Sequence, residues 1–293
     1  MNQRNGTIAL LISGAIFGSF GIWIRLLHPS FGPYLIALFP NVILMIVCGI
    51  VAFYRKEKNE LKDNRYVYLF VILFGIEMTA FSLAVLHTTI ATALSSFYIG
   101  ALVSSFSIGK IFFQEQMNFF KYGALVILFI ALLFLLFPFS IDRFNLGFMF
   151  AFLAGILEAS TNALRKSFSG KLGMSLVGFA MGLGGVIVSS FLIICMRDFQ
   201  FQPSIFSPFY ILAYGLSYIG VVYLVTYGFR YIDLNIGTIL LSSELFFAVL
   251  FSFLILHENP PIQEWISGFL VVISIIFSNS SFLFSKGKPH DSL

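Results

Sequence analysis

Long apolar runs alternate with short polar loops along the chain. Each run holds roughly 20 residues with few charges, the length that an α-helix needs to cross a bilayer. A transmembrane β-barrel would show runs of about 10 residues that alternate apolar with polar. The pattern therefore predicts an all-α membrane protein with ten transmembrane helices. The runs are Thr7–Leu27, Pro33–Phe53, Tyr66–Leu86, Thr88–Phe113, Phe119–Phe137, Leu146–Leu164, Leu172–Met196, Pro208–Phe229, Ile232–Leu256 and Glu264–Phe284.

The composition agrees with this interpretation. Hydrophobic residues make up 59% of the 293 residues and charged residues 10%, whereas a soluble domain has about 25% charged residues to face water. The ten runs fill most of the chain and leave no room for a soluble domain. The first run is too long for a signal-peptide core, so we expect it to remain as a helix.

The basic residues indicate the orientation. With the N-terminus on the inner side, most Lys and Arg fall on that side, among them Arg165 and Lys166. Arg25, Arg143 and Arg197 fall on the other side. The positive-inside rule then predicts a multi-pass protein of a bacterial cytoplasmic membrane with both termini in the cytoplasm. The net charge of +4 reflects this topology, so membrane lipid is an expected partner and nucleic acid is not.

The chain also repeats itself weakly. The stretch "GAIFGSFGIWIR" from Gly14 resembles "GILEASTNALRK" from Gly155, and "SSFSIGKIFFQE" ending at Glu115 aligns with "AVLFSFLILHE" ending at Glu258. The two shifts, 141 and 143 residues, are nearly equal. Five helices per repeat is an odd number, so the second repeat would lie upside-down in the membrane, as in many secondary transporters.

We therefore expect two inverted five-helix repeats, residues 1–140 and 141–293. The stretches "TTIATALSSFYIGALVSSFSIGKIFFQEQMNFFKYGALVIL" and "LNIGTILLSSELFFAVLFSFLILHENPPIQEWISGFLVVI" resemble the EamA-type transporters of the drug/metabolite transporter superfamily. The second helix lacks the Arg that often stands near its start in that family, and the fourth helix lacks the family's Pro. The resemblance implies a carrier of metabolites or amino acids, often an exporter, with a central cavity between the repeats.

Three acidic residues lie well inside the apolar runs: Glu77, Glu158 and Glu244. A charge at mid-bilayer costs between about 3 and more than 10 kcal/mol, so such residues face a protein interior or a wet path. They could also join helices by hydrogen bonds, but such contacts contribute only about 0.6 kcal/mol on average. A buried carboxyl group can take up a proton or receive the ammonium group of a solute. None of the three aligns with another acid across the repeat.

Polar neighbours extend this candidate site for substrate or proton. Asn162 lies four residues after Glu158, Ser243 precedes Glu244, and Tyr98 lies on the run that aligns with that of Glu244. Tyr218 is a further candidate, with packing or lipid contact as the alternative for it and for Tyr214. Glu115 and Glu258 end their helices and are interpreted as architectural. The candidate residues are Glu77, Glu244, Glu158, Asn162, Ser243, Tyr98 and Tyr218.

No pattern in the sequence indicates an enzyme, a metal site or a bound cofactor. The His residues lie at helix ends or in loops, away from any Ser that they could activate, and no Gly-rich loop is placed to hold phosphate. We therefore expect a secondary transporter of a small organic solute, an amino acid or related amine, with export and proton coupling favoured. The alternatives are an importer of an organic cation and a non-transporting membrane scaffold or receptor, which would have no cavity at Glu77 and Glu244. A homo-oligomer is compatible with the sequence.

Overall fold

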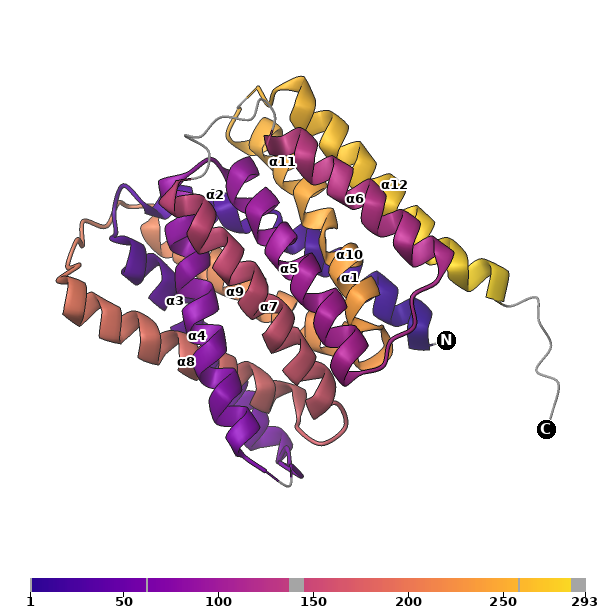
Figure 1. The fold of residues 1–293 in the computed structure, drawn as a ribbon. Helices are drawn as coiled ribbons and strands as arrows, with labels where there is room; N and C mark the ends of the chain where they lie inside the picture. The colour runs from indigo at the N-terminus through magenta and orange to yellow at the C-terminus, as the bar shows by residue number, and fades with distance from the viewer. Residues whose placement is uncertain (1, 62, 137–144, 258, 286–293) are drawn as a thin grey trace.

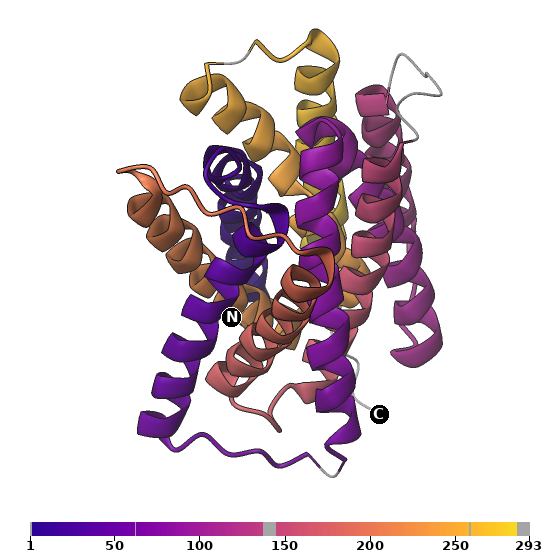
Figure 2. The ribbon, with the colours of Figure 1, turned by 90° about the vertical axis from the view of Figure 1, so that its left-hand side faces the viewer.

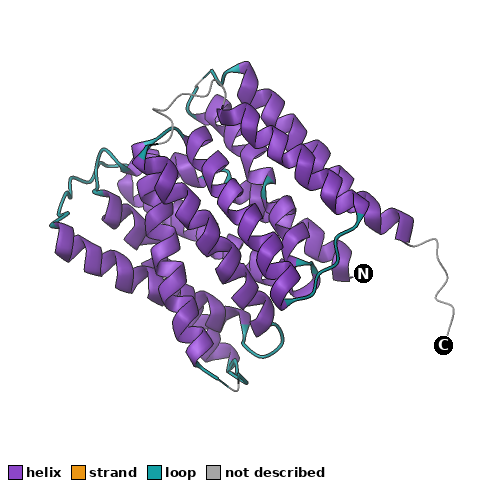
Figure 3. Ribbon diagram, viewed as in Figure 1, coloured by secondary structure: helices purple, strands orange, loops and turns teal. Residues whose placement is uncertain are grey.

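The computed structural model of the chain describes residues 2–61, 63–136, 145–257 and 259–285. This part of the chain folds into a bundle of helices and contains no named strand (Figures 1 and 3). The prediction of an all-α membrane protein is confirmed. The helices are α1 (Asn2–Phe17), α2 (Phe20–Leu27), α3 (Pro33–Arg55), α4 (Arg65–His87), α5 (Ile90–Phe112), α6 (Phe119–Leu136), α7 (Leu146–Phe168), α8 (Met174–Met196), α9 (Ser207–Tyr231), α10 (Leu234–Leu241), α11 (Ser243–Ile255) and α12 (Ile262–Ser285).

The described residues contain nine helical segments long and apolar enough to cross a membrane, and a shorter apolar helix at Ile262–Ser278. Two of the nine are broken. The first span divides into α1 and α2 between Phe17 and Phe20, and the ninth divides into α10 and α11 at Ser242. The prediction of continuous helices was wrong at these two places. A broken helix leaves backbone groups unpaired, and transporters often bind solutes and ions at such breaks.

Helix α7 is longer than the apolar run that predicted it. It continues from the expected end at Leu164 to Phe168 and carries Arg165 into the bundle, where this residue is 4% exposed. The expected end of this helix at Leu164 was therefore too early, and Arg165 belongs to the buried part of α7. A buried guanidinium needs hydrogen-bond and charge partners, and those partners lie in the candidate site.

The two halves of the fold correspond residue by residue. A shift of 141 residues carries α3 onto α8, from Pro33 onto Met174 and from Arg55 onto Met196. The packing follows the same correspondence. Helix α3 packs on its equivalent α8, and α6 packs on its equivalent α12. Helix α4 packs on α7, and their equivalents α9 and α1 pack on each other in the same way. Figure 1 shows α6 beside α12, and Figure 2 shows the connection from α3 to α4 at the lower end of the bundle. This correspondence supports the inverted repeat that the sequence predicts.

Each half caps a helix of the other half. Glu57 accepts hydrogen bonds from the backbone N–H groups of Ser175 (2.9 Å) and Leu176 (3.0 Å) at the start of α8. Asp198 accepts one from the N–H of Tyr34 (3.2 Å) at the start of α3. These acids satisfy N–H groups that a helix start leaves unpaired. Beside the caps, isolated bridges join Asn59 to Leu172 and Phe31 to Phe201.

The shift of 141 residues also carries Glu57 onto Asp198, so the two caps are equivalent contacts at opposite ends of the bundle. They lock the first half to the second. The boundary expected between residues 140 and 141 lies outside the described residues, so the division into domains stays a prediction.

Glu115 plays a similar part at the end of the bundle where α1 begins and α12 ends, which we call the terminal face (Figure 1). Its carboxylate accepts the N–H groups of Leu234 (2.6 Å) and Asn235 (3.1 Å) at the start of α10, and Lys166 donates to it at 2.7 Å. The acid thus ties the end of α5 to α7 and α10. Glu258, its sequence equivalent, lies outside the described residues.

Close helix crossings depend on glycine. At Gly155 of α7, a Cβ atom would overlap the carbonyl oxygen of Phe97 in α5, so these backbones touch. At Gly220 of α9 the nearest atom to an added Cβ is Cδ1 of Ile16, at an ordinary 3.7 Å. The first crossing holds α7, with its acid and its arginine, against α5.

We expect Gly155→Ala to destabilise the fold by about 1–3 kcal/mol, because the helices must move apart to admit a methyl group. Gly220→Ala is the matched control and should leave stability unchanged or raise it, since alanine favours helix. Thermal unfolding of the purified variants in detergent measures both. Equal melting temperatures for the two variants would contradict the crossing.

Candidate functional site

The three membrane-embedded acids meet at one cavity. Glu77 of α4, Glu158 of α7 and Glu244 of α11 all line a hollow of about 20 Å³. They are 3%, 7% and 4% exposed, so none faces lipid. A hollow of this size admits about one water molecule. The rest of its wall is apolar and consists of Phe17, Phe20, Met78, Phe81 and Phe97.

Two of the acids are held by polar residues of α7. The Thr161 hydroxyl lies 2.8 Å from Oε2 of Glu77 and 3.0 Å from the carbonyl oxygen of Glu158. Nδ2 of Asn162 donates to Oε1 of Glu158 at 2.7 Å. Asn162 lies one turn after Glu158, so the helical spacing brings the amide to the carboxyl group.

Arg165 completes this row along α7. Its Nη1 donates to Oδ1 of Asn162 at 2.9 Å, and its guanidinium carbon lies 5.9 Å from the centre of the Phe74 ring. Electrostatic attraction links it to both Glu158 and Glu77. Sequence reasoning misses this residue because it follows the end of the apolar run and stands beside Lys166, among the basic residues of the inner side. The spacing in "EASTNALR" places acid, amide and arginine on one helical face and could have revealed it.

The charges of the cluster do not balance. Three carboxyl groups line the cavity and one guanidinium, that of Arg165, interacts with two of them, while no Lys or Arg of the described residues lines the cavity wall itself. If all three acids were ionised, two negative charges would remain without a counter-charge. A buried unpaired charge is very unfavourable. The site therefore needs protons or a cationic group from outside the protein.

Glu244 lies at the break between α10 and α11. In a continuous helix the Leu241 carbonyl would accept the N–H of Leu245, but that N–H donates to the Ser242 carbonyl instead, at 2.9 Å. The freed Leu241 oxygen lies 2.8 Å from the Tyr98 hydroxyl of α5. The same hydroxyl lies 2.6 Å from Oε2 of Glu244.

Two tyrosines of α9 stand near these acids. Tyr214 and Tyr218 are 0% and 2% exposed, so lipid contact is excluded for both. Their rings pack on Phe20, with centroids 5.2 and 5.3 Å away. Both hydroxyls and Nε of Arg165 are buried without a hydrogen-bond partner within the protein, which leaves hydrogen-bond donors available to a solute.

Three of the seven predicted residues, Glu77, Glu158 and Glu244, line the cavity, and Asn162, Tyr98 and Tyr218 lie beside them. Ser243 is buried at the helix break, where a Cβ on Gly14 would overlap its hydroxyl oxygen, and this hydroxyl has no hydrogen-bond partner within the protein. Gly14 lets α1 pack closely on the break. Among the described residues no group of three or more His, Cys, Asp or Glu could hold a metal ion.

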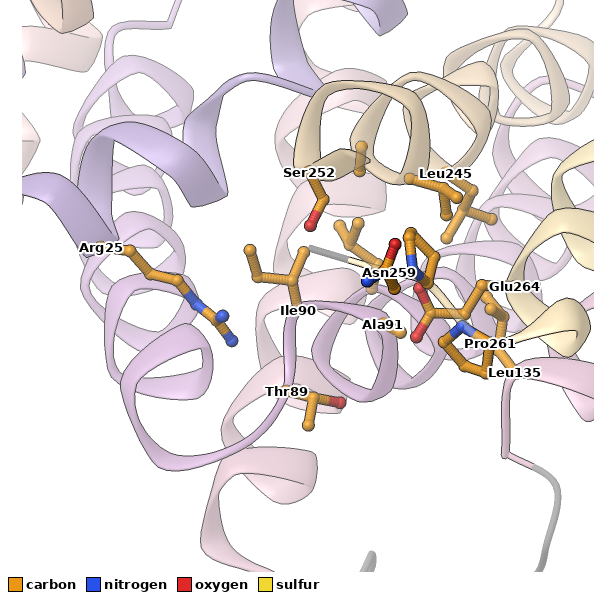
Figure 4. A pocket seen from close by; sticks show the side chains of 14 residues that line it. Arg25, Thr89, Ile90, Ala91, Leu135, Leu245, Ser252, Asn259, Pro261 and Glu264 are labelled. Atoms are coloured by element: carbon orange, nitrogen blue, oxygen red, sulfur yellow. The ribbon is translucent and has the colours of Figure 1, made fainter. Parts of the chain in front are cut away.

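A larger pocket opens on the face opposite the terminal face. Its volume is about 320 Å³, and Figure 4 shows Arg25 and Glu264 on opposite sides of it. We call it the vestibule. Its wall includes Leu245, which follows Glu244, and Leu94, one turn before Tyr98. Toward the terminal face, a hollow of about 10 Å³ touches Arg165. The acid cavity lies between the two and is separate from both.

Comparison with known proteins agrees with this architecture. Residues 145–280 match the EamA-like transporter family. The match confirms the resemblance found in the sequence, and it indicates a membrane transporter of the drug/metabolite transporter superfamily.

A solved structure described as "Crystal structure of protein" superposes with a TM-score of 0.75 over 94% of this chain and 98% of its own. The sequences are 15% identical, so this similarity concerns the fold alone. No curated protein matches the sequence.

Removing the guanidinium should expose the charge imbalance. We expect Arg165→Met to destabilise the protein by about 3–5 kcal/mol, because the carboxylates lose their counter-charge. The double variant Arg165→Met/Glu158→Gln should recover part of this loss. Thermal unfolding of the single and double variants measures the recovery. Arg230→Met, at an exposed arginine near the same end of the bundle, is the control and should change stability by about 1 kcal/mol or less.

Strictly additive effects of the two substitutions would show that Arg165 and Glu158 do not interact. A loss for Arg230→Met as large as that for Arg165→Met would show that any lost arginine destabilises the fold, whatever its surroundings.

Proposed function

We propose that the protein is a proton-coupled secondary transporter that moves a small amine-bearing organic solute, an amino acid or a close relative, out of the cell. The observation that carries the proposal is the excess of buried carboxyl groups over buried cations at one cavity. Protons and the ammonium group of a solute are the two positive species that can neutralise the excess carboxyl groups in turn. An exchange of one for the other couples the two flows.

The polar groups around the cavity also suit a zwitterion. Glu77 and Glu158 accept hydrogen bonds and carry negative charge, which matches an ammonium group. The unpartnered hydroxyls of Tyr214 and Tyr218 and Nε of Arg165 are donors, which match a carboxylate. Helix α7, which carries Glu158 and Arg165, packs on both α4 with Glu77 and α9 with the two tyrosines. An importer of an organic cation needs only the first kind, so the buried donors favour an amino acid.

Alternating access fits the inverted repeat. In this structure a vestibule is open on one face, and the corresponding region of the terminal face is closed by Glu115 and Lys166. If the termini are cytoplasmic, as the basic loops predict, the vestibule faces outward and is the exit for an exported solute.

Flux measurements in proteoliposomes test the proposal. We expect Glu77→Gln and Glu244→Gln each to abolish solute flux or to remove its dependence on pH, because each variant lacks a group that can bind a proton or an ammonium. A panel of amino acids and amines supplies the solutes, and a pH-sensitive dye reports proton movement. Glu60→Gln, at an exposed loop acid, is the matched control and should transport as the wild type does.

The proposal is wrong if both buried variants fold and transport with the pH dependence of the wild type. If no solute in the panel moves and no melting temperature rises with any of them, the scaffold or receptor alternative is preferred.

A further inference from the structure

We infer that Glu244 is the proton-carrying acid of the cluster, and that Tyr98 couples its proton to the break between α10 and α11. This division of labour rests on the proposed transport function. It assigns Tyr98 as a positioning residue, which acts through Glu244 and the backbone of the break.

The assignment follows from counting hydrogen atoms. A tyrosine hydroxyl has one hydrogen to donate, yet the Tyr98 oxygen lies 2.8 Å from the Leu241 carbonyl oxygen and 2.6 Å from Oε2 of Glu244. An ionised Glu244 and the Leu241 carbonyl can only accept hydrogen bonds. The single Tyr98 hydrogen can serve one of them, so the Tyr98 oxygen would lie against the other oxygen with no hydrogen between the two. Both contacts become hydrogen bonds if Glu244 is protonated and donates to Tyr98, which donates to Leu241.

The partners of Glu244 differ from those of the other two acids. Each of the three acids has a neutral hydrogen-bond partner, and the Thr161 hydroxyl meets Glu77 and a carbonyl oxygen much as Tyr98 meets Glu244 and Leu241. Glu77 and Glu158, however, also interact with the guanidinium of Arg165, whereas Glu244 has no cation beside it. The ionisable groups that face it are Tyr98 from α5, Glu158 from α7, Glu77 from α4 and Tyr214 from α9. Helix α1 contributes Gly14, Gly18 and Phe17, and the charged Arg25 of α2 and Glu264 of α12 lie in the vestibule.

No cation therefore touches Glu244 among the described residues, so a proton is the positive charge that its surroundings favour in this conformation. The anion is nevertheless within reach. Glu244 lies in the first turn of α11, where the helix dipole stabilises negative charge, and Tyr98 can donate to it. A group that is stable in both forms can load and release a proton.

Loss of the proton changes the backbone contact. A hydrogen bond to a carboxylate is roughly twice as strong as one between neutral groups, so Tyr98 would turn its hydrogen to the ionised Glu244. The Leu241 carbonyl then loses its donor. The nearest replacement is the N–H of Leu245, which would have to leave the Ser242 carbonyl and restore a continuous helix. Proton release thus favours closing the break.

The contact also joins the two halves. Tyr98 and Leu241 are 143 residues apart, the shift that relates α5 to α10 and α11, so each occupies the place of the other in its own half. A change of this bond acts where the repeats meet. That position suits a link between proton occupancy and the relative movement of the halves.

Infrared difference spectroscopy of the purified protein in bilayers, without added solute, tests the protonation directly. We expect the wild type at neutral pH to show the carbonyl band of a protonated carboxylic acid. Glu244→Gln should lose one component of that band, Tyr98→Phe should shift this component because its hydrogen-bond partner is gone, and Glu77→Gln and Glu158→Gln should keep it. Identical spectra for the wild type and Glu244→Gln would overturn the assignment.

Hydrogen exchange at the Leu245 amide tests the coupling to the break. In the wild type, the protection of this amide should change when the pH is raised above the value at which the infrared band of Glu244 disappears. In Glu244→Gln, whose amide can donate to Tyr98 as the protonated acid does, protection should stay constant with pH. A wild-type response retained in Glu244→Gln would overturn the coupling. A band at Glu244 without solute flux would instead contradict the proposed function and leave the proton site standing.

Discussion

Carboxyl groups inside a bilayer require a counter-charge or a proton, because lipid supplies neither water nor ions to solvate them. At 4 Å, two opposite charges attract by about 4 kcal/mol when the effective dielectric constant is near 20. One arginine can therefore offset the insertion cost of one neighbouring acid and part of the insertion cost of a second. It cannot serve three. The arrangement of Glu77, Glu158, Glu244 and Arg165 is complete only when something positive enters from outside, and this requirement relates the structure to transport.

The helices around this cluster pack rigidly on one another, whereas the contacts at the helix breaks beside it can be rearranged. Glycines bring the backbones of α5 and α7 into contact, while Gly14 of α1 packs on the break at Ser242, and Gly18, at the first break, packs on Phe247 and Ala248 of α11. Backbone groups at a break accept new partners more readily than those inside a continuous helix. The acids therefore sit between fixed helices and a joint with two hydrogen-bonding arrangements, and small changes in charge can select between these arrangements.

The large-scale fold could be predicted because lipid imposes a length on every spanning helix and a repeat imposes an order on them. The three buried acids could be found for the same reason, since an acid inside an apolar run stands out. Arg165 could not be found by that rule, because it lies at the end of its run beside Lys166. The break in the ninth span also gave no signal: Ser242 is an ordinary helix residue by propensity, and the hydroxyl that meets the freed carbonyl comes from α5, far away in the chain. Both failures concern features that tertiary contacts determine.

The exchanged caps have a consequence for the making of the protein. Helix α3 obtains the acid at its start from Asp198, and α8 obtains its own from Glu57. A ribosome that has released only the first five spans has therefore inserted a helix whose leading amides still await a residue not yet synthesised. The first half can enter the membrane early, but it can reach its final structure only when the second half has been made. A truncated chain would leave the N–H groups at the start of α3 uncapped, and quality-control proteases could recognise that end.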